Sequence, residues 1–225
     1  MKDELRKILE SNELGAVVEL ALDKRRVLSH LVRLAYDKDT LLGWRAIKAV
    51  GLIAKELVRR DAEFLREQVR RLLWSLNDES GGIGWAAPEL IGEIIAAAPQ
   101  TFKELIPPLT LAFDAEEATF RPGVVYALGS IAEAAPDIAA VYRRIIISSL
   151  LDRAALTRVY GLMLIERLWH TAQKAGLWSP EYTSRIKHVI KRLGTDKEGA
   201  WVYNGTNFDN VVVADYAMRL NKKLN

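Results

Sequence analysis

The sequence predicts an all-α protein, an α-solenoid of about five antiparallel helix pairs forming one domain over residues 1–225. Two observations carry this. Aspartates separate amphipathic segments at intervals of 36 to 44 residues: Asp37, Asp78, Asp114, Asp152 and Asp196. Glycines follow the first three aspartates by 14 or 15 residues: Gly51, Gly92 and Gly129. A repeat of about forty residues containing two helices is typical of an α-solenoid.

Hydrophobic periodicity places the individual helices along the chain. Two short helices are expected near 2–10 and 12–22. In each pair that follows we call the first helix A and the second B. The A helices are expected near 24–36, 61–77, 100–113, 137–151 and 180–193. The B helices are expected near 39–59, 83–98, 118–134, 155–174 and 207–222. Pro99 and Pro136 separate a B helix from the next A helix, because proline resists helix continuation.

The repeated aspartates follow A helices that end alike, as in Leu34-Ala35-Tyr36-Asp37 and Leu111-Ala112-Phe113-Asp114. A carboxylate placed before a helix can accept hydrogen bonds from its free N–H groups and meets the positive end of its dipole. We therefore expect these aspartates to have a structural role at the start of the B helices.

The B helices align on their glycines. The run Gly43-Trp44 to Gly51 matches Gly84-Trp85 to Gly92, and a third copy ends at Gly129. Small residues inside a helix usually permit close packing. The expected neighbour is the A helix of the same pair. The fourth copy has Glu166 at the glycine position, which indicates either a shifted register or a polar group required there.

This pattern resembles the HEAT-repeat superfamily, in which antiparallel helix pairs with an aspartate at the turn are stacked in register. The resemblance covers residues 24–174 and implies a right-handed superhelix of the armadillo type. The segment from Asn77 to Trp85 is similar to a small bacterial HEAT-repeat family of unassigned activity. The resemblance concerns fold more than activity.

Composition limits the function classes. The formal net charge is +3, from 32 basic and 29 acidic side chains, which does not favour a nucleic-acid partner. The chain has no cysteine, so thiolate chemistry is excluded, and its three histidines are widely spaced. No cofactor or metal is expected. No signal peptide or membrane span is recognised, which predicts a cytoplasmic protein, expected to be a monomer with no membrane partner.

The candidate binding site is the concave face, which B helices line in such stacks, together with the loop before the second B helix. The residues that define it are Asp78, Glu79, Trp85, Glu89, Glu93, Arg121, Tyr126, Arg158 and Tyr160. They predict an acidic cleft edged by aromatic rings, suited to a protein or peptide of mixed or basic charge. Phosphate binding at the glycine-rich loop is not favoured, because Asp78 and Glu79 would repel an anion.

The segment 201–210 departs from the repeat. Its aromatic and amide residues suit either a binding loop or a cap on the exposed end of the core. We expect it to be a loop.

A non-enzymatic protein-binding scaffold is the leading interpretation, because no catalytic motif is evident. The alternative is an enzyme that acts on alkylated bases. HEAT-like DNA glycosylases place tryptophan, an acidic residue and arginine on successive inner helices, and Trp85, Glu89, Arg121 and Arg158 have a similar order. Those enzymes have aspartate as the acidic residue, and their surface is more basic than that of this chain. A third possibility is an accessory factor for a cofactor or metalloenzyme system.

Overall fold

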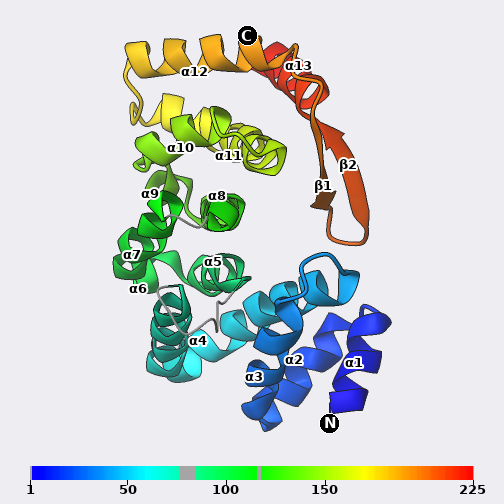
Figure 1. Ribbon diagram of the computed structural model, residues 1–225. Helices are drawn as coiled ribbons and strands as arrows, with labels where there is room; N and C mark the ends of the chain where they lie inside the picture. The colour runs from blue at the N-terminus through cyan, green and yellow to red at the C-terminus, as the bar shows by residue number, and fades with distance from the viewer. Residues whose placement is uncertain (1, 77–84, 116–117, 225) are drawn as a thin grey trace.

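The computed structural model describes residues 2–76, 85–115 and 118–224, which form a curved stack of helices with a β-hairpin on its open side (Figure 1). The elements are α1 (Lys2–Glu10), α2 (Leu14–Asp23), α3 (Arg26–Ala35), α4 (Leu41–Ser75), α5 (Ala87–Ala97), α6 (Pro99–Phe102), η1 (Lys103–Leu105), α7 (Ile106–Leu111), η2 (Ala112–Asp114), η3 (Ala118–Phe120), α8 (Arg121–Ala134), α9 (Pro136–Ala140), α10 (Arg143–Leu150), α11 (Ala155–Lys174), α12 (Pro180–Leu193), β1 (Gly199–Tyr203), β2 (Phe208–Val212) and α13 (Val213–Lys223). The predicted all-α stack of helices is confirmed, with the β-hairpin as an addition to it.

The first B helix and the second A helix are joined in α4. They are distinct helices, because Asp61 has non-helical dihedral angles (φ −159°, ψ 71°) where the sequence predicts the boundary. The Asp61 carboxylate accepts a hydrogen bond from the backbone N–H of Phe64 at 3.0 Å. Arg25 also donates to it at 2.6 Å, which holds the pKa of Asp61 below its usual value. Asp61 therefore begins the second helix of α4 and ties it to the preceding repeat.

The third and fourth A helices are broken into short pieces. The predicted helix 100–113 is divided among α6, η1, α7 and η2, and the predicted helix 137–151 between α9 and α10. Pro107 and Pro108 stand in the first turn of α7, where their missing N–H groups and fixed φ are tolerated. The B helices α5, α8 and α11 stay continuous. They lie side by side along the inner side of the stack (Figure 1).

The role expected of the aspartates is wrong in detail. Thr40 caps α4, accepting a hydrogen bond from the N–H of Gly43 at 3.1 Å. The side chain of Asp152 accepts one from the N–H of Ala154, before α11 begins. Asp114 instead pairs with Arg144 of the next repeat. Asp114 and Asp152 thus mark turns and form ion pairs with residues of neighbouring repeats.

The expected neighbour of the glycines is also wrong. A Cβ atom added to Gly92 would overlap Ala127 of α8, the next B helix. One added to Gly51 would overlap the Glu93 carboxylate of α5, and one on Gly129 would meet Arg167 of α11. The glycines thus allow adjacent B helices to approach and leave room for charged side chains between them. At the fourth position, Glu166 accepts hydrogen bonds from Tyr216 and Lys223 of α13, so the glutamate anchors the last helix.

The last repeat contains a β-hairpin in place of the predicted loop and the start of the fifth B helix. Strands β1 and β2 are antiparallel, with Trp201 opposite Asn210 and Tyr203 opposite Phe208. The Asn204 side chain accepts hydrogen bonds from the N–H groups of Thr206 and Asn207, and Gly205 adopts φ 103°. Among the described residues these two strands form the only sheet.

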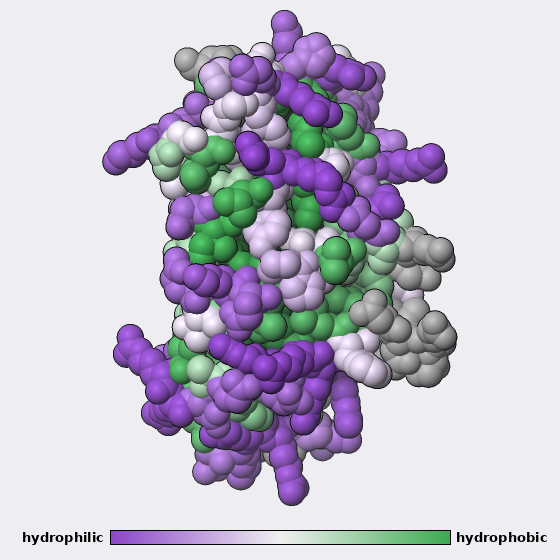
Figure 2. All heavy atoms as spheres, turned by 90° about the vertical axis from the view of Figure 1, so that its left-hand side faces the viewer, coloured by the Kyte–Doolittle hydropathy of each residue, from purple (hydrophilic) through white to green (hydrophobic). Residues whose placement is uncertain are grey.

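The opposite face of the molecule is built from the A helices. Figure 2 shows hydrophilic bands on this face with apolar areas between them. Two exposed apolar side chains, Leu111 and Leu151, lie at the ends of A helices. None of the described helices combines the length and apolar character needed to cross a membrane.

Candidate functional site

The hairpin crosses the open side of the stack and contacts its first repeat. The Tyr203 ring stacks on the Trp44 indole of α4, with centroids 5.5 Å apart and planes 13° from parallel. Trp44 also meets Tyr126 of α8 edge to face, and Tyr126 meets Tyr160 of α11 in the same way. Aromatic contacts therefore connect three B helices and the hairpin across the concave face.

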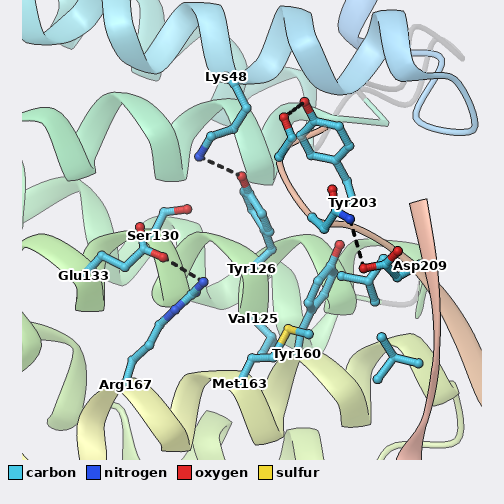
Figure 3. A pocket seen from close by; sticks show the side chains of 14 residues that line it. Lys48, Val125, Tyr126, Ser130, Glu133, Tyr160, Met163, Arg167, Tyr203 and Asp209 are labelled. Carbon is cyan, nitrogen blue, oxygen red and sulfur yellow. Dashed lines mark hydrogen bonds and ion pairs between the residues drawn. The ribbon is translucent and has the colours of Figure 1, made fainter. Parts of the chain in front are cut away.

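One cavity lies between the hairpin and the middle of the B helices. We call it the tyrosine cavity. Its volume is about 340 Å³, and Figure 3 shows side chains that line it. Its lining comes from α4, α8, α11 and the hairpin, and consists of Lys48, Val125, Tyr126, Ser130, Glu133, Tyr160, Met163, Arg167, Val202, Tyr203, Asn204, Gly205, Asp209 and Val211.

A network centred on Glu93 lies at one side of the tyrosine cavity. Glu93 is 7% exposed, and its Oε1 accepts hydrogen bonds from Lys48 Nζ at 2.8 Å, Tyr126 Oη at 2.7 Å and Ser130 Oγ at 2.9 Å. Burial, reinforced by the negative charge of Glu93, raises the pKa of Tyr126 well above its usual value. Tyr126 therefore stays a neutral hydrogen-bond donor, and the buried carboxylate is satisfied by a cation and two hydroxyl groups.

The lining of this cavity also includes the Arg167–Glu133 ion pair, with nitrogen and oxygen 2.7 Å apart. In Figure 3 these two side chains face each other, while Tyr160 and Met163 rise beside them from α11. Asp209 of the hairpin accepts a hydrogen bond from Asn204 at 2.9 Å. The cavity is therefore lined by charges of both signs next to aromatic rings.

A second cavity, of about 540 Å³, lies toward the beginning of the B helices, and we call it the Glu89 cavity. Its lining is Lys38, Asp39, Trp44, Glu89, Thr119, Pro122, Leu156, Tyr160, Trp201 and Phe208. Trp201 and Phe208 come from the hairpin, whose other residues line the tyrosine cavity. The hairpin thus separates the two cavities, and Tyr160 borders both.

Glu89 is the most buried charged side chain in the second cavity, with 2% of its surface exposed. Lys38 Nζ donates to its Oε1 at 2.7 Å. Its Oε2 accepts no hydrogen bond from any residue in the described ranges. The carboxylate lies over Gly123, where an added Cβ atom would come within 2.7 Å of Oε2. Burial, and then the Glu89 charge, raise the pKa of Tyr160.

Besides Glu93, three predicted site residues among those described lie outside the lining of both cavities. Trp85 is 43% exposed and packs on Phe120 at a centroid distance of 6.3 Å. Arg121 pairs with Asp152 at 3.2 Å and donates to the carbonyl oxygen of Phe113. Asp78 and Glu79 fall outside the described residues.

Arg158 is the third of these predicted site residues, and it connects two successive turns of the repeat stack. It donates to the carbonyl oxygens of Asp152 and Arg153, both at 2.7 Å, and pairs with Asp196 and Glu198. One repeat earlier, Arg121 reaches Asp152 in the same way. Both guanidinium groups therefore have partners within the protein. This arrangement gives them a structural role and does not favour the glycosylase interpretation.

The sequence and structure comparisons concern fold alone. No protein-family model and no curated protein matches the sequence. An archaeal HEAT-like repeats protein from Thermococcus onnurineus NA1 is similar over 100% of this chain and 97% of its own, at 16% identity and a TM-score of 0.40. An engineered protein is similar over 99% of this chain and 89% of its own, at 16% identity and a TM-score of 0.54. The similarity to the engineered protein shows a shared fold and does not indicate a function.

Sequence reasoning found the concave residues Glu89, Glu93, Tyr126 and Tyr160 but missed the hairpin that covers them. A signal for the hairpin was present. The Asn204-Gly205 pair is flanked by β-branched and aromatic residues, a pattern typical of a β-hairpin. No group of three or more histidine, aspartate and glutamate side chains suited to a metal occurs in the described part of the chain.

Proposed function

We propose that this protein is a non-enzymatic scaffold that binds an extended segment of a partner protein between its B helices and its hairpin. The observation that supports this most is the contact of Tyr203 with Trp44, which turns an open concave face into two bordering cavities. Cavities of about 340 and 540 Å³ suit side chains of a segment and are too small for a folded domain.

The charges of the cleft support a partner of mixed or basic charge. The tyrosine cavity has Lys48 and Arg167 beside Glu133 and Asp209. The basic side chains Lys38, Lys48 and Arg167 each contact a carboxylate. A phosphate backbone needs uncompensated cations, so duplex DNA is not the expected partner. Tyrosine and tryptophan supply contact area with little loss of conformational freedom, as is common in peptide-binding surfaces.

An array of immobilised twelve-residue peptides of random sequence tests the proposal. Met163→Trp would fill the tyrosine cavity from α11, whereas Trp74→Ala changes a side chain that is 78% exposed on the outer part of α4. We expect the unaltered protein and Trp74→Ala to capture the same peptides, and Met163→Trp to lose them. Circular dichroism and thermal melting verify that the variants are folded. Capture that survives in a folded Met163→Trp protein would place binding elsewhere.

A further inference from the structure

The Glu89 cavity combines three features that point to a cationic ligand. Its walls include the rings of Trp44, Tyr160, Trp201 and Phe208. Its floor includes the buried carboxylate of Glu89. Its lining includes two carboxylates, Asp39 and Glu89, and one lysine, Lys38, so negative charge is in excess. Aromatic faces attract ammonium groups through the ring quadrupole, and they do so most strongly when the ammonium is removed from water.

The hydrogen bonds of Glu89 make the cavity incomplete without a ligand. Lys38 neutralises Oε1, but Oε2 has no donor among the described residues although Glu89 is almost entirely buried. A buried carboxylate oxygen without a donor costs free energy, and a carboxylate can accept from two cations at once. A ligand that donates to Oε2 would remove this cost. An anionic or neutral apolar ligand would not.

The neighbouring residues hold the carboxylate at this position. Lys38 donates from one side, and Gly123 leaves the space that a larger residue would fill. Trp44 Nε1 donates to the carbonyl oxygen of Lys38 at 2.9 Å, which ties the indole to the turn that carries the lysine. The hairpin residue Trp201 is 66% exposed, so its ring is available to a ligand that enters from solvent.

We infer that the Glu89 cavity binds the alkylammonium group of a lysine side chain, with Glu89 Oε2 as its acceptor and the four aromatic rings as its walls. This inference rests on the proposed function and adds the chemistry of one anchoring residue in the partner segment. Lysine suits the cavity better than arginine, because a single acceptor oxygen offers no bidentate partner for a guanidinium fork.

Small amides of single amino acids test this without knowledge of the partner. Nα-acetyl-lysine methylamide, its ε-trimethyl form and the neutral Nα-acetyl-norleucine methylamide are titrated while NMR records the indole N–H signals. The Trp44 and Trp201 signals are assigned by substitution with phenylalanine. We expect the unmethylated lysine compound to shift these two signals, with a dissociation constant on the order of 1 mM. The ε-trimethyl form keeps the charge but has no N–H to donate to Oε2, so it should bind more weakly, and norleucine should bind at least ten-fold more weakly than lysine. Equal binding of norleucine would overturn the inference.

Two variants and one control locate the binding. Glu89→Gln keeps the shape of the side chain but removes its charge, and should weaken lysine binding about ten-fold. Trp201→Ala removes an exposed ring and should weaken binding several-fold. Because this ring is exposed, the variant is expected to fold, and it tests the site even if Glu89→Gln does not fold. Glu63→Gln, at an exposed ion pair outside both cavities, should bind as the unaltered protein does. Unchanged affinity in a folded Glu89→Gln protein, or in Trp201→Ala, would overturn the inference.

The peptide array separates this inference from the proposed function. If the protein binds the lysine compounds but captures no peptide, the cation site stands and the scaffold proposal fails. If peptides are captured equally well after every lysine is replaced by norleucine, the scaffold proposal stands and the lysine inference fails.

Discussion

The Trp44 indole and the Tyr203 phenol ring stack 5.5 Å apart, although 159 positions of chain separate them. Trp44 belongs to the first B helix and Tyr203 to the hairpin after the last A helix. The contact therefore joins the beginning of the repeat stack to its end. It also joins the hairpin to the B helices, and residues of the hairpin line both cavities.

Tyr203→Ala tests how far this contact holds the hairpin in place. An aromatic pair contributes about 0.5–1.5 kcal/mol beyond its buried area, so we expect a modest fall in the free energy of unfolding. The larger effect should be local. Amide hydrogens of β1 and β2 should exchange faster, while those of α5 and α8 should not change. Trp201→Ala, on the same strand, is the control. Equal exchange rates in Tyr203→Ala and the unaltered protein would show that other contacts fix the hairpin.

Gly92→Ala tests the contact between adjacent B helices. The added methyl group would overlap Ala127, whose backbone cannot move without displacing α8. We expect a loss of about 1–3 kcal/mol in the free energy of unfolding, measured by urea denaturation.

Gly15→Ala is the matched control, because an added Cβ atom there meets nothing within 4 Å. Alanine has the higher helix propensity, so this variant should be neutral or slightly stabilised. If Gly92→Ala were as stable as Gly15→Ala, the B helices would not be in close contact at Gly92.

The extent to which sequence predicted the structure differs from feature to feature. The aspartate interval placed the B helices, and their inner faces do bring Lys48, Glu93 and Tyr126 together. The same interval could not identify the neighbour of a glycine, because periodicity shows that one side of a helix is packed without showing against what. Residues 199–212 carry no repeat signal. The contact that Tyr203 of this segment makes with Trp44 depends on the curvature of the whole stack, and a local sequence pattern does not predict that curvature.

Glu166→Gln tests a pH-dependent anchor of α13. Burial opposes ionisation of Glu166, but hydrogen bonds from Lys223 and Tyr216 prevail and lower its pKa. A carboxyl group whose pKa is lower in the folded state stabilises the protein above its unfolded pKa, and this contribution is lost as the pH falls through the folded pKa. We therefore expect acid to weaken the docking of α13.

Urea denaturation at pH 7 and near pH 3.5 measures this effect. Glu166→Gln should lower the free energy of unfolding at pH 7 by about 1–2 kcal/mol, and the difference from the unaltered protein should shrink in acid. The control is Glu63→Gln, because the Glu63 side chain is 69% exposed and its ion pair lies at the surface. This variant should have nearly the same free energy of unfolding as the unaltered protein at either pH. A constant deficit of Glu166→Gln at both pH values would contradict the assigned role.

Substitutions of Lys48 and Glu93 should be unequal in their effects, although the two residues form one ion pair. The Lys48 side chain is 36% exposed and the Glu93 side chain 8%. In Glu93→Gln the ammonium group can still reach water, so the expected loss is about 1 kcal/mol. In Lys48→Met the donors left to the buried carboxylate, among the described residues, are the hydroxyl groups of Tyr126 and Ser130. Removing one partner of a buried pair leaves an uncompensated charge, and the expected loss is about 2–4 kcal/mol.

A double-mutant cycle separates this pairing from other effects of the two substitutions. The variant with both changes should be more stable than the sum of the single losses predicts, by about 1–2 kcal/mol, because it no longer contains the unpaired carboxylate. The control is the cycle for Arg71 and Glu67, which lie 69% and 45% exposed on the outer part of α4 and should couple by less than about 0.5 kcal/mol. Two outcomes would contradict this role of Lys48: additive losses for Lys48 and Glu93, or a larger loss in Glu93→Gln than in Lys48→Met. Either would mean that solvent, and not Lys48, compensates the Glu93 charge. The network beside the tyrosine cavity would then be more open to water than its burial indicates.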